Sequence, residues 1–189
     1  LETSSRNSEV IHSGIYYPAN SLKAILSKKG NELLYNYCDL KKVNYDKCGK
    51  YVIGFNTSDK KRLKMLKDNA FANGVESELI NEGELAERQP NVHACNALYF
   101  KNTGIIDSHG FMSNLINDIK NKNVHVVYKT IFKDIKKIKD GFSVRIENPD
   151  KSIDDISSKI VINSAGHESY NVSSILGVNE KNYKLQFWK

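Results

Sequence analysis

Short apolar runs divide this chain of 189 residues into stretches with helical spacing and stretches of strand length. Strands are predicted at residues 14–17, 50–55, 97–100, 124–128 and 159–163. The last of these is continuously apolar, which is typical of a strand buried on both faces of a parallel sheet. No run approaches the roughly 20 apolar residues that a membrane-spanning helix needs. The mixture of short strands and helices predicts an α/β fold.

Three longer helices are predicted, because a residue able to cap a helix precedes each apolar stripe. The expected N-caps are Ser21, then Thr57 or Ser58, then Asp107 or Ser108. The helices are expected to end near Cys38, at Asn73–Gly74 and at residues 121–123. The apolar stripe of the first helix consists of Leu22, Ile25, Leu26, Leu33, Leu34 and Tyr37. Shorter helical segments are expected at residues 85–90 and 168–176.

A β-hairpin is predicted at residues 131–138 and 142–146, where two alternating runs flank a turn at Asp140–Gly141. Residues 148–155 carry the fewest signals of regular structure. A hairpin in the same chain as a buried parallel strand indicates an α/β domain with an inserted sheet.

The opening stretch, residues 3–14, concentrates hydrogen-bond donors in one extended run with little apolar content. Its polar side chains include Thr3, Ser4, Ser5, Arg6, Asn7, Ser8 and His12. Hydroxyl and backbone N–H groups donate to phosphate oxygens and a guanidinium adds positive charge, so the stretch suits a phosphate-bearing ligand. An ordinary serine-rich surface loop has the same composition, and composition alone favours that simpler interpretation.

Two further sequence blocks contain a glycine close to the predicted start of a helix. In INSAG at residues 162–166, small residues follow the end of a predicted strand and precede the start of a predicted helix. This arrangement lets backbone approach a ligand, although plain strand–helix packing is the more common reason for it. In TGIIDSH at residues 103–109, Gly104 suits a close approach and Asp107 suits a helix N-cap, which we favour over a catalytic role.

The net charge of +6 does not by itself indicate a nucleic-acid site. Arginine accounts for only 4 of the 28 basic residues and the lysines are scattered, whereas nucleic-acid surfaces usually cluster arginines among aromatic residues. No nucleic-acid partner is therefore expected. The three cysteines form no CxxC pair and the five histidines lack ligand spacing, so no metal site is expected. Free thiols suit a reducing compartment, and a cytoplasmic location is predicted.

Four blocks in order, RNSEVIHSGIYYP at residues 6–18, CGK at 48–50, TGIIDSH and INSAG, carry a family resemblance. The chain resembles the FAD-dependent L-2-hydroxyglutarate dehydrogenase/oxidase family, a branch of the D-amino-acid-oxidase-like flavoproteins. The resemblance implies an incomplete FAD-binding Rossmann-like domain with part of an inserted mixed or antiparallel substrate-domain sheet. Residues 1–38 and 107–177 would form the partial FAD-binding domain, and residues 39–106 and 178–189 the partial substrate domain.

The resemblance also implies roles for single residues. Those implied to contact FAD are Thr3, Ser4, Arg6, Asn7, Ser8, Ile131, Ala165 and Gly166. His12 and Tyr16 would face the flavin or the substrate, with His12 as catalytic base because an imidazole titrates near neutrality. A lone histidine is, however, more often structural. Tyr16 and Lys50 would bind an acidic substrate, with a solvated strand residue as the alternative interpretation of Lys50.

The implied reaction is the oxidation of a 2-hydroxy acid, with L-2-hydroxyglutarate to 2-oxoglutarate as the best candidate. The resemblance covers the middle of a family member, and none of the 11 glycines forms a GxGxxG fingerprint. We therefore expect weak or no FAD binding by this chain alone, and the flanking halves of a split enzyme as its partners. Two other functions stay open: another amine- or glycerol-3-phosphate-type oxidoreductase, and a non-catalytic remnant that binds a partner through a sheet edge. Peripheral attachment to the inner membrane is the alternative to a free cytoplasmic protein.

Overall fold

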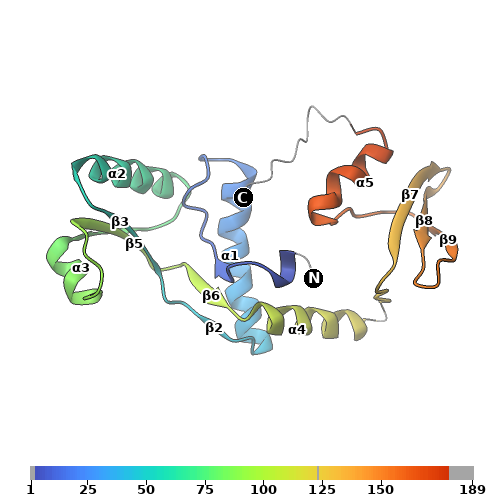
Figure 1. Cartoon of the computed structure of the whole chain (residues 1–189), viewed down its shortest axis with the longest axis horizontal. Helices are drawn as coiled ribbons and strands as arrows, with labels where there is room; N and C mark the ends of the chain where they lie inside the picture. The colour runs from blue at the N-terminus through green and yellow to red at the C-terminus, as the bar shows by residue number, and fades with distance from the viewer. Residues whose placement is uncertain (1–2, 123, 179–189) are drawn as a thin grey trace. The chain divides into compact units, whose positions relative to one another are not determined.

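A computed structural model describes residues 3–122 and 124–178 of the chain (Figure 1). The chain forms two compact units, Leu1–Lys122 and Asn123–Lys189, and each is described by itself. The assignment of residues to FAD-binding and substrate domains stays a prediction, and its last segment, residues 179–189, lies outside the described residues.

Helices of the first unit begin where side chains cap them. They are η1 (Thr3–Ser5), α1 (Leu22–Lys41), α2 (Thr57–Ala72), α3 (Glu82–Arg88) and α4 (Ser108–Lys120). The Ser21 side chain accepts a hydrogen bond from the Ala24 N–H, and Asp107 accepts one from the Gly110 N–H, so both predicted caps are confirmed. The cap of α2 is Asn56, one residue before the predicted position, and its side chain satisfies a free N–H in the same way.

Two three-stranded antiparallel sheets complete the first unit. Their orders are β1 (Val10–Ile11), β6 (Gly104–Ile106), β2 (Tyr45–Asp46), and β3 (Lys50–Gly54), β5 (Asn96–Phe100), β4 (Glu78–Asn81). The strands predicted at residues 50–55 and 97–100 are confirmed as β3 and β5. The strand predicted at residues 14–17 is wrong, because Gly14 has a φ of +86° and its neighbours form a turn.

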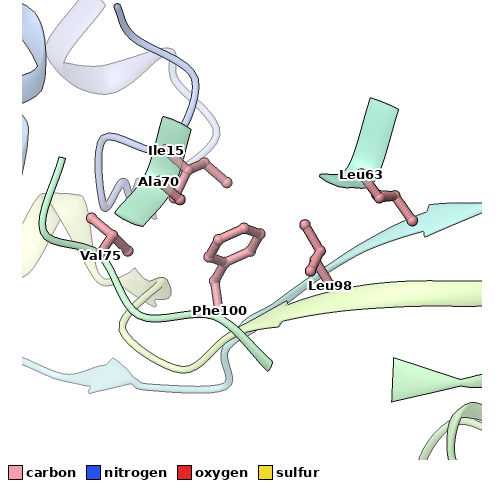
Figure 2. Packing of buried hydrophobic residues seen from close by; sticks show 6 residues of the cluster. All are labelled: Ile15, Leu63, Ala70, Val75, Leu98 and Phe100. Carbon is pink, nitrogen blue, oxygen red and sulfur yellow. The ribbon is translucent and has the colours of Figure 1, made fainter. Parts of the chain in front are cut away.

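Helix α2 packs on one face of the β3–β5–β4 sheet and α3 packs on the other. Figure 2 shows the first of these cores with Phe100 at the centre of the labelled side chains. Its buried members are Ile15, Leu63, Ala70, Val75, Leu98 and Phe100. Leu98 and Phe100 share one face of β5 because they are two residues apart, and Ala97 contributes to the core on the other face.

Helix α1 buries a different face from the one that its apolar pattern predicts. Its buried residues are Ala24, Asn31, Tyr35 and Cys38. Leu22, Ile25, Leu26 and Leu33 of the predicted stripe are instead 53–74% exposed. On the buried face, Asn31 Nδ2 and the Tyr35 hydroxyl both donate to the Asn102 carbonyl, at 2.8 and 3.2 Å. These hydrogen bonds compensate the polar atoms that this face of the helix buries.

The second unit is a three-stranded antiparallel sheet followed by short helices. Its elements are β7 (Ile131–Ile138), β8 (Gly141–Glu147), β9 (Ile153–Ser158), η2 (Gly166–Glu168) and α5 (Ser169–Ile175). The predicted hairpin is confirmed, and at Gly141 a side chain would lie 2.2 Å from the Ser158 carbonyl oxygen. Strand β9 takes up only the last three residues, 153–155, of the segment that carries few signals of regular structure.

Two strand predictions in the second unit are wrong. Residues 124–128 and 159–163 have no regular structure, and Ile160 and Ile162 are 75% and 82% exposed. A buried parallel strand needs hydrogen-bonded neighbours on both sides. Within the described residues every strand pairing is antiparallel, so the expected parallel partners of this segment are missing there. The described fold is therefore a mixture of helices and antiparallel sheets.

Candidate functional site

Residues 12–17, here called the site loop, connect β1 to α1 and are held by side-chain amides of α2. Asn69 Nδ2 donates to the carbonyls of Ile15 and Tyr17, at 2.8 and 2.9 Å. Asn73 Nδ2 donates to the carbonyls of Gly14 and Tyr17, at 3.1 and 2.9 Å. These four bonds replace the ladder that a strand would make, and they fix the turn in one conformation.

The other end of the site loop is fixed by α1 and by the TGIIDSH block. Asn31 Nδ2 donates to the His12 carbonyl at 3.2 Å. The buried hydroxyl groups of Ser13 and Thr103 lie 3.1 Å apart, and the Thr103 carbonyl accepts the Gly49 N–H at 2.9 Å. Thr103 therefore joins three of the blocks that carry the family resemblance.

A hollow of about 20 Å³ lies between the site loop, Lys50 at the start of β3, and Thr103. His12, Tyr16 and Lys50 all line this hollow, so the structure brings together the predicted catalytic residue and both predicted substrate residues. Lys50 Nζ lies 4.7 Å from the centre of the Tyr16 ring, within the range of a cation–π contact. The hollow has room for about one water molecule, so by itself it is too small for an organic substrate.

The electrostatics of the hollow favour a neutral imidazole beside a positive charge. His12 is exposed as a residue, but partial desolvation of its ring lowers its pKa, and the positive charge of Lys50 lowers it further. A neutral imidazole can accept a proton. The ammonium group of Lys50 can bind a carboxylate, and the Tyr16 hydroxyl can donate a hydrogen bond.

Residues 3–8, here called the opening strip, form η1 and the turn that follows, beside α4. The side chains of Thr3, Ser4, Arg6, Asn7 and Ser8 are exposed. The Asn7 side chain makes its hydrogen bonds to nearby backbone. Its amide donates to the carbonyls of Thr3 and Ser4, and its oxygen accepts a hydrogen bond from the Glu9 N–H. Asn7 therefore shapes the strip.

Glu9 links the opening strip to α4, and the sequence patterns did not single it out. Its carboxylate accepts hydrogen bonds from the Ser108 N–H at 3.1 Å and from the Ser108 hydroxyl at 2.5 Å. These two bonds lower the pKa of Glu9, and the N-terminus of α4 favours the negative charge. Glu9 has a φ of 55°, which few residues other than glycine adopt. An acidic residue directly after a polar strip was the available signal.

The donor set of the opening strip fits an FAD phosphate or ribose edge. Residues with hydroxyl groups precede and follow Arg6 in the sequence, and its guanidinium has no ion-pair partner within residues 3–122 and 124–178. The other predicted FAD contacts, Ile131, Ala165 and Gly166, belong to the second unit and are exposed. A Cβ atom at Gly166 would meet nothing within 4 Å, so the roles of these three residues stay predictions.

Across residues 3–122 and 124–178, no group of three or more His, Cys, Asp or Glu side chains is placed to hold a metal ion. In the same ranges, the helices are too short or too polar to cross a bilayer.

Known proteins resemble this chain in sequence along most of its length. Residues 1–184 match the family model of the FAD-dependent oxidoreductases, named DAO. L-2-hydroxyglutarate dehydrogenase of Escherichia coli K12 is 30% identical over 74% of this chain and 33% of its own length. The human mitochondrial enzyme is 34% identical over 86% of this chain and 34% of its length. The Arabidopsis thaliana mitochondrial enzyme is 41% identical over 60% of this chain and 24% of its length. The chain thus spans about a quarter to a third of these relatives.

Solved structures show the same fold at lower identity. The L-α-glycerophosphate oxidase of Mycoplasma pneumoniae, a structure with FAD bound, matches with a TM-score of 0.82 at 23% identity, over 92% of this chain and 47% of that one. Glycine oxidase of Geobacillus kaustophilus matches with a TM-score of 0.79 at 12% identity, over 93% and 48%. The resemblance carried by the four sequence blocks is confirmed, and FAD is the cofactor of the parent fold. The chain belongs to the DAO family of FAD-dependent oxidoreductases.

Proposed function

We propose that this chain is a segment of an FAD-dependent oxidoreductase that oxidises a 2-hydroxy acid, with L-2-hydroxyglutarate as the best candidate. The observation that carries the proposal is the convergence of His12, Tyr16 and Lys50 on one hollow. The named activity of the relatives at 30–41% identity supports the choice of substrate. Solved structures below 25% identity support the fold and leave the substrate open.

Each of the three residues has a separate role toward the substrate. The Lys50 ammonium binds a carboxylate and orients the molecule, and the Tyr16 hydroxyl donates to a second oxygen. His12 is held neutral by desolvation and by Lys50, so its imidazole accepts the proton of the substrate hydroxyl. FAD, when bound, supplies the acceptor for the hydrogen and electron pair of the α-carbon.

Cofactor contacts in the proposal come from exposed donors. Thr3, Ser4, Arg6 and Ser8 hold FAD from the opening strip, while Asn7 shapes it. In the second unit the corresponding contacts are Ile131, Ala165 and Gly166. Because the hollow holds about one water molecule, we propose that flanking polypeptide completes both the substrate cavity and the FAD site.

Purification of the chain alone, and together with polypeptides that supply the flanking parts of the parent, tests the proposal. Visible flavin absorbance reports FAD binding, and reduction of a dye reports oxidation of L-2-hydroxyglutarate, D-2-hydroxyglutarate, glycerol 3-phosphate or glycine. We expect little flavin on the chain alone. The completed protein should retain flavin and turn over L-2-hydroxyglutarate. Preference for glycerol 3-phosphate or glycine, or flavin retention with no oxidation at all, would overturn the proposal.

Two substitutions assign the roles within the completed protein. His12→Gln should lower kcat by about 10²-fold or more, the usual contribution of a general base. Lys50→Met should raise KM for L-2-hydroxyglutarate more than it lowers kcat, because it removes a carboxylate contact. His93→Gln is the matched control, since His93 is exposed and lies outside the lining of the hollow. Equal losses for His12→Gln and His93→Gln would argue against His12 as the base.

A further inference from the structure

An open groove of about 520 Å³ lies between α2 and the β3–β5–β4 sheet, on the face that carries the core of Figure 2. Its apolar lining is formed by Leu63 of α2, Leu98 of the central strand and Leu79 of β4. Leu63 and Leu98 are buried, whereas Leu79 is 52% exposed. Cavities of this size are typical of small-molecule sites.

The groove exists because α2 covers only part of the sheet. Helix α2 packs against β3 and β5, where Leu63, Leu98 and Val52 meet. In the register of the sheet, Leu79 pairs with Leu98 and therefore belongs to the same face. Strand β4 is at the edge of this sheet, and the helix leaves its face uncovered. An apolar strip thus continues from the core to the surface.

The rim of the groove is strongly basic. Lys60, Lys64 and Lys67 recur at helical spacing on one face of α2, and Lys61 lies beside them. None of these four lysines has an ion-pair partner among the residues that the structure describes, and Asp68 is the single carboxylate in the lining. Four unpaired like charges along one helix destabilise it slightly, so a ligand that neutralises them would be favoured.

We propose that this groove binds a monomeric long-chain carboxylate. Its alkyl chain lies along the half-exposed Leu79, which the buried Leu63 and Leu98 support from behind, and its carboxylate lies among the lysines of α2. The apolar part of the groove binds the alkyl chain of the ligand, and the unpaired lysines bind its carboxylate. The groove and the ligand therefore match in both their apolar and their charged parts. A short dicarboxylate makes no use of the floor, and a cationic amphiphile is repelled by the rim. Binding here does not depend on the proposed oxidation.

Fluorescence titration of the full chain with 11-(dansylamino)undecanoic acid tests the site. We expect saturable binding of one probe per chain, with displacement by laurate and weaker displacement by octanoate. Lys64→Glu combined with Lys67→Glu should weaken probe binding at least tenfold. Lys137→Glu combined with Lys139→Glu is the control, because these exposed residues of the second unit change the net charge by the same amount. Circular dichroism checks that each variant is folded.

A variant of the floor and two other ligands separate the alternatives. Leu79→Thr keeps a strand-forming residue and should weaken laurate binding about tenfold, while leaving a short anion such as butyrate unaffected. Equal binding of dodecyltrimethylammonium, or equal losses in both charge-reversal variants, would overturn the proposal. Sedimentation with phosphatidylglycerol vesicles but no saturable binding of laurate would also overturn it, because the surface would then recognise a membrane and not a single chain.

Discussion

Lys50 Nζ lies 4.7 Å from the centre of the Tyr16 ring and lines the same hollow as His12. The contact joins the first residue of β3 to the site loop and keeps a positive charge beside the imidazole. Burial and this charge act on His12 in the same direction, and both favour the neutral ring. The relationship therefore links a packing contact to the protonation state on which a base depends.

Lys50→Met should raise the pKa of His12 toward its ordinary value of 6.5, because it removes the repulsion of the protonated ring. NMR titration of the His12 ring protons measures the change. Lys23→Met is the matched control, since Lys23 Nζ lies 5.8 Å from the Tyr17 ring and makes a similar contact. A His12 pKa that is the same in both variants would show that desolvation alone sets it.

The same shift makes stability depend on pH. The pKa of His12 is lower in the folded protein than 6.5, so the unfolded chain binds more protons between the two values. The contribution of His12 to the free energy of unfolding is therefore complete above pH 6.5 and falls as pH decreases toward the folded pKa. Urea unfolding of the wild type and of His12→Gln across this window should show a smaller decrease for the variant. Parallel curves would contradict the shift.

Asn69→Ala should destabilise the chain by about 1–3 kcal/mol, because it leaves the Ile15 carbonyl of the site loop without its donor. The Tyr17 carbonyl loses the same donor but keeps its hydrogen bond from Asn73. Asn117→Ala in α4 is the control, since its exposed side chain makes no hydrogen bond within the described residues and alanine favours the helix. Urea unfolding compares the two variants. A loss for Asn69→Ala no larger than that of the control would mean that the loop is held by packing alone.

Local signals were enough to predict where the longer helices begin and where the β-hairpin turns. A cap such as Ser21 or Asp107 and a turn such as Asp140–Gly141 depend on a few neighbouring residues, and the structure confirms each of them. Convergence of His12 with Lys50 was predictable only through the family resemblance, since no local pattern relates a residue before α1 to the first residue of β3.

Features that depend on distant partners could not be predicted. The buried face of α1 includes Asn31 and Tyr35, whose partner, the Asn102 carbonyl, is distant in the sequence, so hydrophobic spacing alone points to the wrong side of the helix. The apolar segment at residues 159–163 has strand composition, but none of the described strands pairs with it. The role of Asn69 likewise depends on the carbonyls of Ile15 and Tyr17, which are 54 and 52 residues away in the sequence.

Glu9→Gln should reduce stability near neutral pH and have little effect in acid. The two hydrogen bonds from Ser108 lower the pKa of Glu9 below its ordinary value of 4.5, so the stabilisation is present above that pH. It is lost as pH falls through the folded pKa, where the wild-type carboxyl becomes neutral like the amide. Urea unfolding at about pH 7 and about pH 3 measures the difference. Glu32→Gln, on the exposed side of α1, should show no such dependence.

Gly104→Ala and Gly30→Ala should change stability in opposite directions. A Cβ atom at Gly104 would lie 2.4 Å from both the Asp46 carbonyl oxygen and the Tyr35 hydroxyl, and the backbone oxygen cannot move aside without disturbing the β6–β2 pairing. We expect a loss of about 1–3 kcal/mol from overpacking. Gly30 lies within α1 with nothing within 4 Å, so alanine there should add roughly 0.5–1 kcal/mol by lowering the entropy of the unfolded chain. Thermal or urea unfolding of the two variants measures both changes in stability. An unchanged free energy of unfolding for Gly104→Ala would mean that β6 can shift away from β2.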